Sequence, residues 1–551
     1  MKSKIYIIMF SCFMLKLGNV GKAVCHSQGL SNVGDEFKII TQMFLYKFIN
    51  DKFGVLLKQK DENIKNSANW EQEYSRLSPE KRDRLLKRIA NENPILFPEE
   101  LLSYLVNNSN KDDFAKIFDS AMESISQRNS DLFSTRTTGR TNIEFMEPLT
   151  QCVVDPNKRN QFAKALVCKL VNFSFAEAFN EHYDFFSHIF EYLIRDYNAN
   201  SGEAYAEYYT PRAIATIMAR LLIGDSKDLK SVTIYDPSAG TGTLLMALSH
   251  IIGENKCTIY AQDISQKSSK MLKLNLILNG IISSLPNIIQ GDTLLEPSHF
   301  DPGNKNKLRK FDFVVSNPPF KLNFEGSRDE LAMMGERFWA GVPNIPKKRK
   351  KGMPIYTLFI QHVINSLNNE TGKGAIVVPT GFVSALLGVE NAIIRKIVDE
   401  RLITGVINMP SNVFANTGTN VSVLFFDKAN RYSDVVLIDA SKLGIDDKSS
   451  KTKKTSLTDD DIEKIVNTFI KREKIDEFSA VVTYDEITQH KYSLSPGQYF
   501  DIKIEYVDIS EEEFKKQINE YSEELRQLFK ESDDLQREIL DKLGKLKYEK
   551  S

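Results

Sequence analysis

Four consecutive residues near the middle of the chain combine an amide, two rigid rings and an aromatic face: Asn317, Pro318, Pro319 and Phe320. They follow the run Phe311–Ser316, which has the composition of a short buried strand. Because proline lacks an amide N–H and restricts the residue before it, the strand must end there. An amide beside a flat ring on a stiff loop can grip a planar amine such as the exocyclic N6 of adenine. A rigid turn without chemistry is the alternative.

A second segment, about eighty residues upstream, joins a β-rich run to a loop of small residues. The run is Val232–Tyr235, and Leu244–Leu248 after the loop is predicted to be helical. Glycine lets a backbone approach a ligand at a helix N-terminus, so the segment is typical of a nucleotide-binding sheet. No Gly-Lys-Ser/Thr follows, which excludes a P-loop. The loop residues are Asp236, Pro237, Ser238, Ala239, Gly240, Thr241 and Gly242.

Three acidic residues end three successive short apolar runs. Asp236 ends the first run, Asp263 the second, and Asp292 follows the third. Asp263 lies about 20 residues beyond the glycine loop, the separation expected of a carboxylate that binds a ribose diol. Each acid alone has the alternative of a turn or cap residue. Together, at the carboxyl ends of parallel strands, they are predicted to face one crevice.

The glycine loop followed by Asn317–Phe320 resembles the S-adenosylmethionine-dependent adenine-N6 DNA methyltransferases with the gamma order of motifs. More closely, the chain resembles the modification (M) subunit of type I restriction–modification systems. Three further segments carry this resemblance: Tyr208–Arg212, Gly372–Pro379 and Ser493–Tyr499. The resemblance implies a site-specific DNA-methyltransferase (adenine-N6-specific) that transfers a methyl group from S-adenosyl-L-methionine to a flipped adenine.

The resemblance also implies roles for individual residues. The Asn317 side-chain oxygen and the Pro318 carbonyl would accept the two N6 hydrogens, and Phe320 would stack on the base. No metal is implied. The implied catalytic residues are Asn317, Pro318, Pro319 and Phe320. The implied cofactor-binding residues are Tyr208, Tyr209, Thr210, Pro211, Asp236, Pro237, Ser238, Ala239, Gly240, Thr241, Gly242, Asp263 and Asp292.

Within that cofactor site, the resemblance places Asp236 and the glycines near the methionine portion, with Tyr209, Thr210 and Pro211 closing over it. Asp263 would hold the ribose hydroxyls and Asp292 the adenine amine of the cofactor. Many relatives carry Glu where this chain has Asp263, which shortens the reach.

The elements that must position these residues form an α/β fold. Short apolar runs alternate with helical segments to about Phe426, and the resemblance implies a Rossmann-like class I methyltransferase domain with a mostly parallel seven-stranded sheet. Helical periodicity precedes it, with Ser126–Asn142 predicted as a loop. The predicted divisions are 1–29 (a leader or non-conserved extension), 30–175 (an all-helical N-terminal domain), 176–445 (the methyltransferase domain) and 446–551 (a C-terminal region with a coiled-coil helix).

The composition of the chain limits which partners it can bind by itself. The chain has 551 residues, 42% of them hydrophobic and 26% charged, and a formal net charge of −1. This excludes a globally basic nucleic-acid binder, so DNA contact must come from local patches or from a partner. The basic run 347–351 is one candidate patch, with a solvated loop as the alternative. Five cysteines without CxxC spacing predict neither disulfides nor zinc, as in a cytoplasmic protein.

The two ends of the chain carry separate signals. Ile5–Leu15 has signal-peptide length but is too short to span a bilayer, so 1–29 is a signal-like leader, a misassigned start or a helix. Near the other end, apolar residues recur in steps of three and four, which predicts a coiled-coil arm for a partner; packing on its own protein is the alternative. The recurring residues are Phe514, Ile518, Tyr521, Leu525, Leu528, Leu535 and Ile539, with Ser532 at one position.

The resemblance implies as partners double-stranded DNA, a specificity (S) subunit shared by two M subunits and a restriction (R) subunit, without a membrane. Two other functions stay open. One is a class I methyltransferase acting on protein glutamine or RNA; the other is a catalytically silent S-adenosylmethionine-binding assembly subunit. The intact Asn317–Phe320 loop argues against the silent subunit. No target-recognition domain is evident, so specificity is expected to lie in a partner.

Overall fold

The computed structural model describes two compact units, Met1–Phe500 and Asp501–Ser551. The described residues are 33–90, 93–130, 135–137, 142–143, 146–172, 174–176, 179, 210–224, 226, 229–346, 352–414, 420–446, 455–500 and 510–544. The segment 1–29, the pair Tyr208 and Tyr209, and the basic run 347–351 lie outside these residues, so the predictions made for them stay predictions.

The first described part of the chain is mostly helical, as predicted. Its longest helix buries the predicted face, including Met43, Phe44 and Phe48. Side-chain caps start the shorter helices, since Asp61 and Asn69 each accept two backbone amides. The helices are α2 (Val33–Lys60), α3 (Glu62–Asn66), α4 (Trp70–Ser75), α5 (Pro79–Ile89), α6 (Leu102–Asn108), α7 (Phe114–Arg128) and α9 (Pro156–Leu170), with 3-10 turns η1 (Pro98–Glu100) and η2 (Thr150–Cys152).

The segment Ser126–Asn142, predicted as a loop, departs from that prediction. α7 continues through Arg128, Thr135–Thr137 forms β1, and β2 (Asn142–Ile143) pairs with β1. β1 runs parallel to β5 of the large central sheet, with Arg136 opposite Ile289. The loop prediction is wrong here because a strand of only three residues has no periodicity of its own. It depends on a partner strand about 150 residues away.

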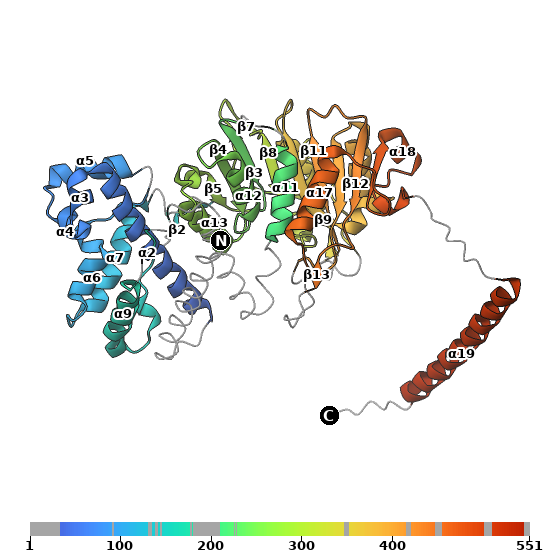
Figure 1. Cartoon of the computed structure of the whole chain (residues 1–551), viewed down its shortest axis with the longest axis horizontal. Helices are drawn as coiled ribbons and strands as arrows, with labels where there is room; N and C mark the ends of the chain where they lie inside the picture. Colours follow the sequence, from blue (N-terminus) through green and yellow to red (C-terminus); the bar gives the residue numbers. More distant parts are fainter. Residues whose placement is uncertain are drawn as a thin grey trace. The chain divides into compact units, whose positions relative to one another are not determined.

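A large mixed sheet forms the centre of the first unit (Figure 1). Across the described residues it has eleven strands in the order β15-β12-β10-β11-β9-β8-β3-β4-β5-β1-β2. Its seven central strands, from β10 to β5, match the predicted mostly parallel sheet, with β11 antiparallel to both neighbours. The strand bounds are β3 (Val232–Asp236), β4 (Cys257–Asp263), β5 (Ile288–Gln290), β8 (Phe313–Ser316), β9 (Lys373–Pro379), β10 (Ile403–Asn408), β11 (Val421–Asp427), β12 (Asp434–Asp439) and β15 (Ser479–Thr483).

Helices cover both faces of this sheet, because successive side chains of a buried strand point to opposite sides. Val315 and Val377 belong to the core under one layer, and Val314 and Ile376 to the core under the other. The first layer contains α11 (Arg212–Ile223), α12 (Thr243–Ile252), α13 (Gln266–Leu278) and α17 (Asp459–Lys471); α11, α12 and α17 are visible in Figure 1. The second contains α15 (Tyr356–Ser366), α16 (Gly388–Asp399) and α18 (Tyr484–Gln489).

Shorter elements complete the first unit. Two small antiparallel sheets are formed by β6 (Phe300–Asp301) with β7 (Asn304–Leu308) and by β13 (Ile445–Asp446) with β14 (Thr455–Ser456). The remaining pieces are α14 (Arg328–Met333) and the 3-10 turns η5 (Ile282–Asn287), η6 (Glu325–Ser327), η8 (Thr380–Ser384) and η9 (Pro496–Gln498). Because β15 joins the large sheet and the unit extends to Phe500, the predicted division at 445/446 falls inside a compact unit.

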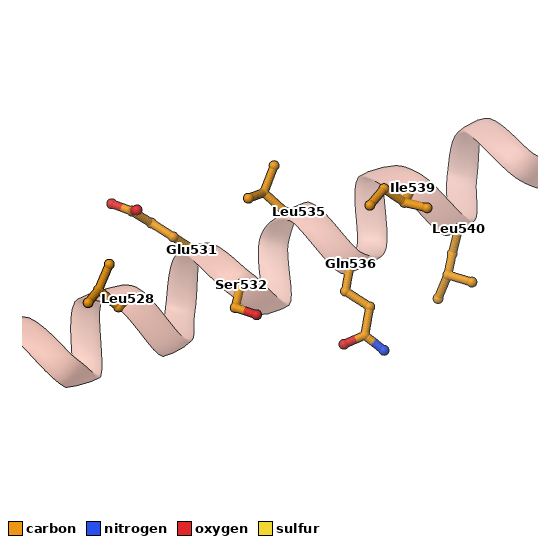
Figure 2. A pocket seen from close by; sticks show the side chains of 7 residues that line it. All are labelled: Leu528, Glu531, Ser532, Leu535, Gln536, Ile539 and Leu540. Carbon is orange, nitrogen blue, oxygen red and sulfur yellow. The ribbon is translucent and has the colours of Figure 1, made fainter. Parts of the chain in front are cut away.

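The second unit contains α19 (Glu511–Gly544), a helix of 34 residues. Its apolar seam is solvent-exposed, with the seven predicted side chains between 47% and 59% exposed. No described residue of the second unit covers this seam, so it is available for burial against a partner or against another part of the chain. A shallow hollow of about 470 Å³ lies along the seam between Leu528 and Leu540, and its lining side chains project from the helix in Figure 2. No helix among the described residues is long and apolar enough to cross a membrane.

Candidate active site

The predicted site residues lie beyond the carboxyl ends of parallel strands. β3 pairs in parallel with β4 and with β8, and β4 with β5, so these strands end at one edge of the sheet. β3 ends at Asp236, β4 at Asp263, Asp292 follows β5, and Asn317 follows β8. This edge is where open α/β sheets bind their ligands. The topology therefore brings together the four segments that the sequence singled out.

The glycine loop forms a close turn between β3 and α12. Gly240 and Gly242 have φ angles of 52° and 86°, in the region that favours glycine. A Cβ at Gly242 would lie 2.2 Å from Leu272 Cδ1, so a side chain there would collide with α13. The Gly240 amide donates to Asp263 Oδ2 at 2.8 Å. The loop is thus held against the end of β4 as well as β3.

Asp236 is the most buried acid of the site, with 1% of its surface exposed. Its Oδ1 accepts the Ser238 amide at 2.9 Å, and the Ser238 hydroxyl lies 2.6 Å from the Ser316 hydroxyl at the end of β8. Burial raises the pKa of Asp236 to about 8, a rise to which the nearby Asp263 adds. Because the folded state holds this proton more tightly than the unfolded state, the carboxyl stabilises the fold. This contribution is complete below the ordinary pKa of 3.8 and is lost as pH rises through about 8.

Asp263 and Asp292 each hold a turn with their carboxylates. Asp263 Oδ1 accepts the Ser265 amide at 2.8 Å, and burial raises the pKa of Asp263. Asp292 Oδ1 accepts the amides of Leu294 and Leu295 at 2.8 and 3.2 Å. The alternative of turn or cap residues thus fits this geometry. It does not exclude ligand binding, because a carboxylate has about four acceptor positions.

Asn317 is held by a residue 107 positions earlier in the chain. Its Nδ2 donates to the hydroxyl of Thr210, which is buried, at 3.1 Å. This contact fixes the plane of the amide and leaves Oδ1 as the acceptor end, to which no described residue donates. The sequence predicted Thr210 only as a cofactor-binding residue, so its contact with Asn317 is an addition. The described neighbour Pro211 begins the approach to α11.

Phe320 is half-buried and fixed by other rings. Its centroid lies 6.4 Å from that of Tyr356 in an edge-on arrangement, and Tyr356 lies 6.0 Å from Phe382. Such edge-to-face pairs orient rings beyond what burial alone provides. The ring is thus held in place by α15 and η8, beside the two prolines. Its stacking role stays a prediction.

One buried group of the site was missed from the sequence. Arg337 lies in the long insertion after Phe320, yet it is only 7% exposed. Its guanidinium donates to the carbonyls of Thr293 and Leu294 at 2.5 and 2.6 Å and to His362 Nδ1 at 3.0 Å. From the sequence, only the basic run 347–351 of this segment was predicted to have a role, as a candidate patch for DNA. Nothing in a single sequence marks Arg337 as buried apart from the adjacent Phe338 and Trp339.

The same group extends to the first strand of the site. His362 Nε2 lies 3.1 Å from the hydroxyl of Tyr235, the residue before Asp236. Burial lowers the pKa of His362 well below its usual value, so this imidazole is neutral at pH 7. Burial also lowers the pKa of Arg337 to about 10, which leaves it a cation at pH 7. No described cluster of three or more His, Cys, Asp or Glu side chains could hold a metal ion.

Comparisons with known proteins agree with this geometry. The sequence matches the N-6 DNA Methylase family over residues 181–522, and the chain belongs to this family. It is 31% identical over 380 residues to the type I restriction enzyme MjaIX methylase subunit of Methanocaldococcus jannaschii, covering 66% of this chain and 63% of that protein. It is 28% identical over 389 residues to the MpnII methylase subunit of Mycoplasma pneumoniae, covering 69% of each.

A solved structure supports the fold as well. The type I restriction-modification system methyltransferase subunit from Streptococcus thermophilus superimposes with a TM-score of 0.70 at 24% identity, covering 89% of this chain and all of that chain. The predicted family and the predicted α/β methyltransferase fold are therefore confirmed. Membership of the family implies S-adenosylmethionine as the methyl donor.

The strand-end loops fit this cofactor. The turn at Gly240 and Gly242 leaves no room for a side chain on the α13 side, which lets backbone approach a ligand. Asp236 and Asp263 supply acidic groups for a molecule that carries positive charge, whereas a pyrophosphate would be repelled. Asp292 Oδ2, with no hydrogen-bond partner among the described residues, can accept an amine.

We predict that Gly242→Ala destabilises the protein and weakens cofactor binding, because the new Cβ would collide with Leu272 Cδ1. The expected loss is about 1–3 kcal/mol beyond that of Gly280→Ala, measured by urea unfolding. Gly280 is the matched control, since its φ is also positive (73°) but nothing lies within 4 Å of the added Cβ. Equal losses in the two variants would contradict the assigned contact.

Proposed function

We propose that this protein is the modification subunit of a type I restriction–modification system and methylates the N6 atom of adenine in double-stranded DNA. The observation that carries the proposal is the orientation of Asn317. Its amide is fixed by Thr210, and its free oxygen lies on the rigid loop after β8, next to the glycine loop of β3. This geometry supports a role for Asn317 Oδ1 as the acceptor of a planar amine beside the proposed cofactor site.

On the base side, the residues act by positioning and by local electrostatics. The adenine amine is a poor nucleophile because its lone pair is delocalised into the ring. Asn317 Oδ1 and the Pro318 carbonyl accept its two hydrogens, which draws electron density onto the nitrogen. Since Nδ2 is engaged by Thr210, the amide presents its oxygen and not its nitrogen to the base. The two prolines keep both acceptors in one orientation.

The target adenine leaves the helix to reach these acceptors, because N6 is paired within the duplex. Phe320 then stacks on the extruded base, a contact worth about 1–3 kcal/mol in other base–aromatic stacks. The edge-to-face contact with Tyr356 would hold the ring in place before the base arrives.

On the cofactor side, S-adenosylmethionine supplies an electrophilic methyl group when it is bound. The Gly240–Gly242 turn and Asp236 would hold its methionine portion, and Tyr208, Tyr209, Thr210 and Pro211 are proposed to close over that end. Asp263 would accept hydrogen bonds from the ribose hydroxyls, and Asp292 would accept one from the adenine amine. Thr210 thus serves both ligands, since it also holds Asn317.

Subunit partners form the second part of the proposal. The relatives are named as subunits of restriction enzymes, and α19 presents an exposed apolar seam of a kind that coiled coils bury. We assign α19 to binding a specificity subunit, with two copies of this chain per specificity subunit and a restriction subunit as a further partner. Residues 30–175 would hold DNA, and the complex would work in the cytoplasm.

The central test of the activity uses Asn317→Ala. This variant should bind S-adenosylmethionine as the wild type does but lose at least about 100-fold in methyl transfer, because one of two acceptors is removed. The complex with its specificity subunit is purified, and transfer of labelled methyl groups to DNA is measured.

The control for that test is Asn323→Ala. Among the described residues, the Asn323 side chain makes one hydrogen bond, in which it accepts the Glu325 amide. This variant should retain full activity. Near-normal transfer by Asn317→Ala would contradict the mechanism. If the wild-type complex methylates protein glutamine or RNA instead of DNA adenine, the proposed substrate is wrong.

A pH dependence follows from Asp236. Since its carboxyl is largely protonated at pH 7 and must ionise to pair with a cation, cofactor affinity should rise with pH up to about 8 and then level off. Calorimetry at pH 7 in two buffers of different ionisation enthalpy should detect the release of about one proton. The Asp236→Asn variant should show no such release. A wild-type heat that is independent of the buffer would contradict this role.

The role of α19 is tested with Leu528→Glu, which places a charge in the apolar seam. It should weaken binding of the specificity subunit at least about thirtyfold, or about 2 kcal/mol, in a titration of the two purified proteins. Lys530→Glu is the matched control, because Lys530 lies on the opposite side of the heptad from the seam. Equal affinities of the two variants would assign the seam to another partner.

A further inference from the structure

Arg337 connects two parts of the proposed site. One is the segment after the base-binding loop Asn317–Phe320, and the other is the turn after Asp292 on the cofactor side. It belongs to the segment after Phe320, but three of its hydrogen bonds reach Thr293 and Leu294, which follow β5, and His362 on α15. His362 in turn contacts Tyr235 on β3. A single side chain therefore links three elements of the site.

The β5 turn is held from two sides. On its amide side, Asp292 Oδ1 accepts the amides of Leu294 and Leu295. On its carbonyl side, Arg337 donates to the carbonyls of Thr293 and Leu294. A backbone pinned at both its donors and its acceptors cannot rotate its peptide planes without losing hydrogen bonds. The direction of the Asp292 carboxylate is thereby fixed.

The same turn is also tied to the glycine loop. The Thr293 hydroxyl donates to the Pro237 carbonyl at 2.6 Å, one residue after Asp236. Arg337 thus indirectly supports the contact between the β5 loop and the β3 loop. All of these groups are buried, where a hydrogen bond is strong and an unpaired partner is costly.

The charge of Arg337 is unusual for a buried residue. Its described hydrogen-bond acceptors are carbonyls, a neutral imidazole and the Met334 sulfur, and none is a carboxylate. Asp292 is an acid whose charge acts on Arg337, although the two share no hydrogen bond. Burying a cation against carbonyl groups alone costs desolvation free energy, so such an arrangement is expected where the positions of its partners matter. This pairing points to positioning of Asp292.

We propose that Arg337 is a positioning residue for cofactor recognition, which acts through Asp292 to select a purine that carries a 6-amino group. This inference rests on the proposed function, since it deepens the role assigned to Asp292. Arg337 itself touches no substrate. Its three-pronged guanidinium fixes the turn so that Asp292 Oδ2 faces the amine. Lysine would keep the charge but could not make the same set of bonds.

The test compares two ligands of the full-length protein: S-adenosylhomocysteine and its analogue in which hydrogen replaces the 6-amino group. Arg337→Lys and Arg337→Gln should bind S-adenosylhomocysteine about tenfold more weakly than the wild type, as for loss of one charge-assisted hydrogen bond. Affinity for the deamino analogue should change less than about twofold, because that ligand never makes the Asp292 bond. Calorimetry measures both.

Arg328→Lys is the matched control, since Arg328 lies in the same insertion but its ion pair with Asp329 is at the surface. It should leave both affinities unchanged. Arg337→Gln removes the buried charge, so it keeps the test open if Arg337→Lys fails to fold. Equal weakening of both ligands, no weakening of either, or loss of folding in both variants would assign Arg337 a structural role and overturn the inference.

Failure of the proposed function gives different results. A wild-type protein that binds neither ligand would overturn the proposed function and this inference with it. If Asp292 binds the amine, the wild type should bind S-adenosylhomocysteine more tightly than the deamino analogue, and Asp292→Ala should lose this difference. Equal wild-type affinities, or full discrimination retained in Asp292→Ala, would remove the role of Asp292 on which Arg337 acts. Normal discrimination that persists in both Arg337 variants would overturn the inference alone.

Discussion

The whole site depends on the parallel pairing of β3 with β4 and β8. In this register Tyr235 lies opposite both Tyr260 and Val314, so the strands end together and their next residues share one edge. A slip of one residue would turn every side chain of a strand to the other face, because the side-chain period of a strand is two. Two apolar cores, one on each face, penalise such a slip. The position of Asp236 relative to Asn317 therefore follows from burial.

Register alone places the loops but does not make them rigid. Rigidity comes from hydrogen bonds between neighbouring loops, each of which supports the next. The Gly240 amide binds Asp263, the Ser238 hydroxyl contacts Ser316, and Thr210 holds Asn317. Interactions that are already formed cost little when a ligand arrives, and this is the basis of preorganised electrostatic catalysis. The acids are therefore turn residues and candidate ligands at once.

The sequence could predict the parts of the site that are local. A strand, a glycine turn and a helix form one contiguous segment, and the double proline ends β8 wherever it occurs. Pairings between distant segments could not be predicted, because one sequence records no contacts. The Thr210–Asn317 bond spans 107 residues, and β1 and β15 join the sheet from segments far outside its centre. Arg337 was missed for the same reason: its partners lie 25 to 44 residues away.

The charges of the chain indicate that the methyl-transfer site and the main source of DNA affinity are different parts of the complex. The site buries acids at the cofactor edge, and the chain as a whole carries a formal charge of −1. Affinity for a polyanion requires several neutralised phosphates, which this balance does not supply by itself. A partner that binds DNA can supply them, and the exposed seam of α19 provides a surface for such a partner. Under the proposed function, the first unit would hold the base and the cofactor in register and would contribute to holding DNA through residues 30–175. The choice of adenine would then lie with the subunit that α19 is proposed to bind.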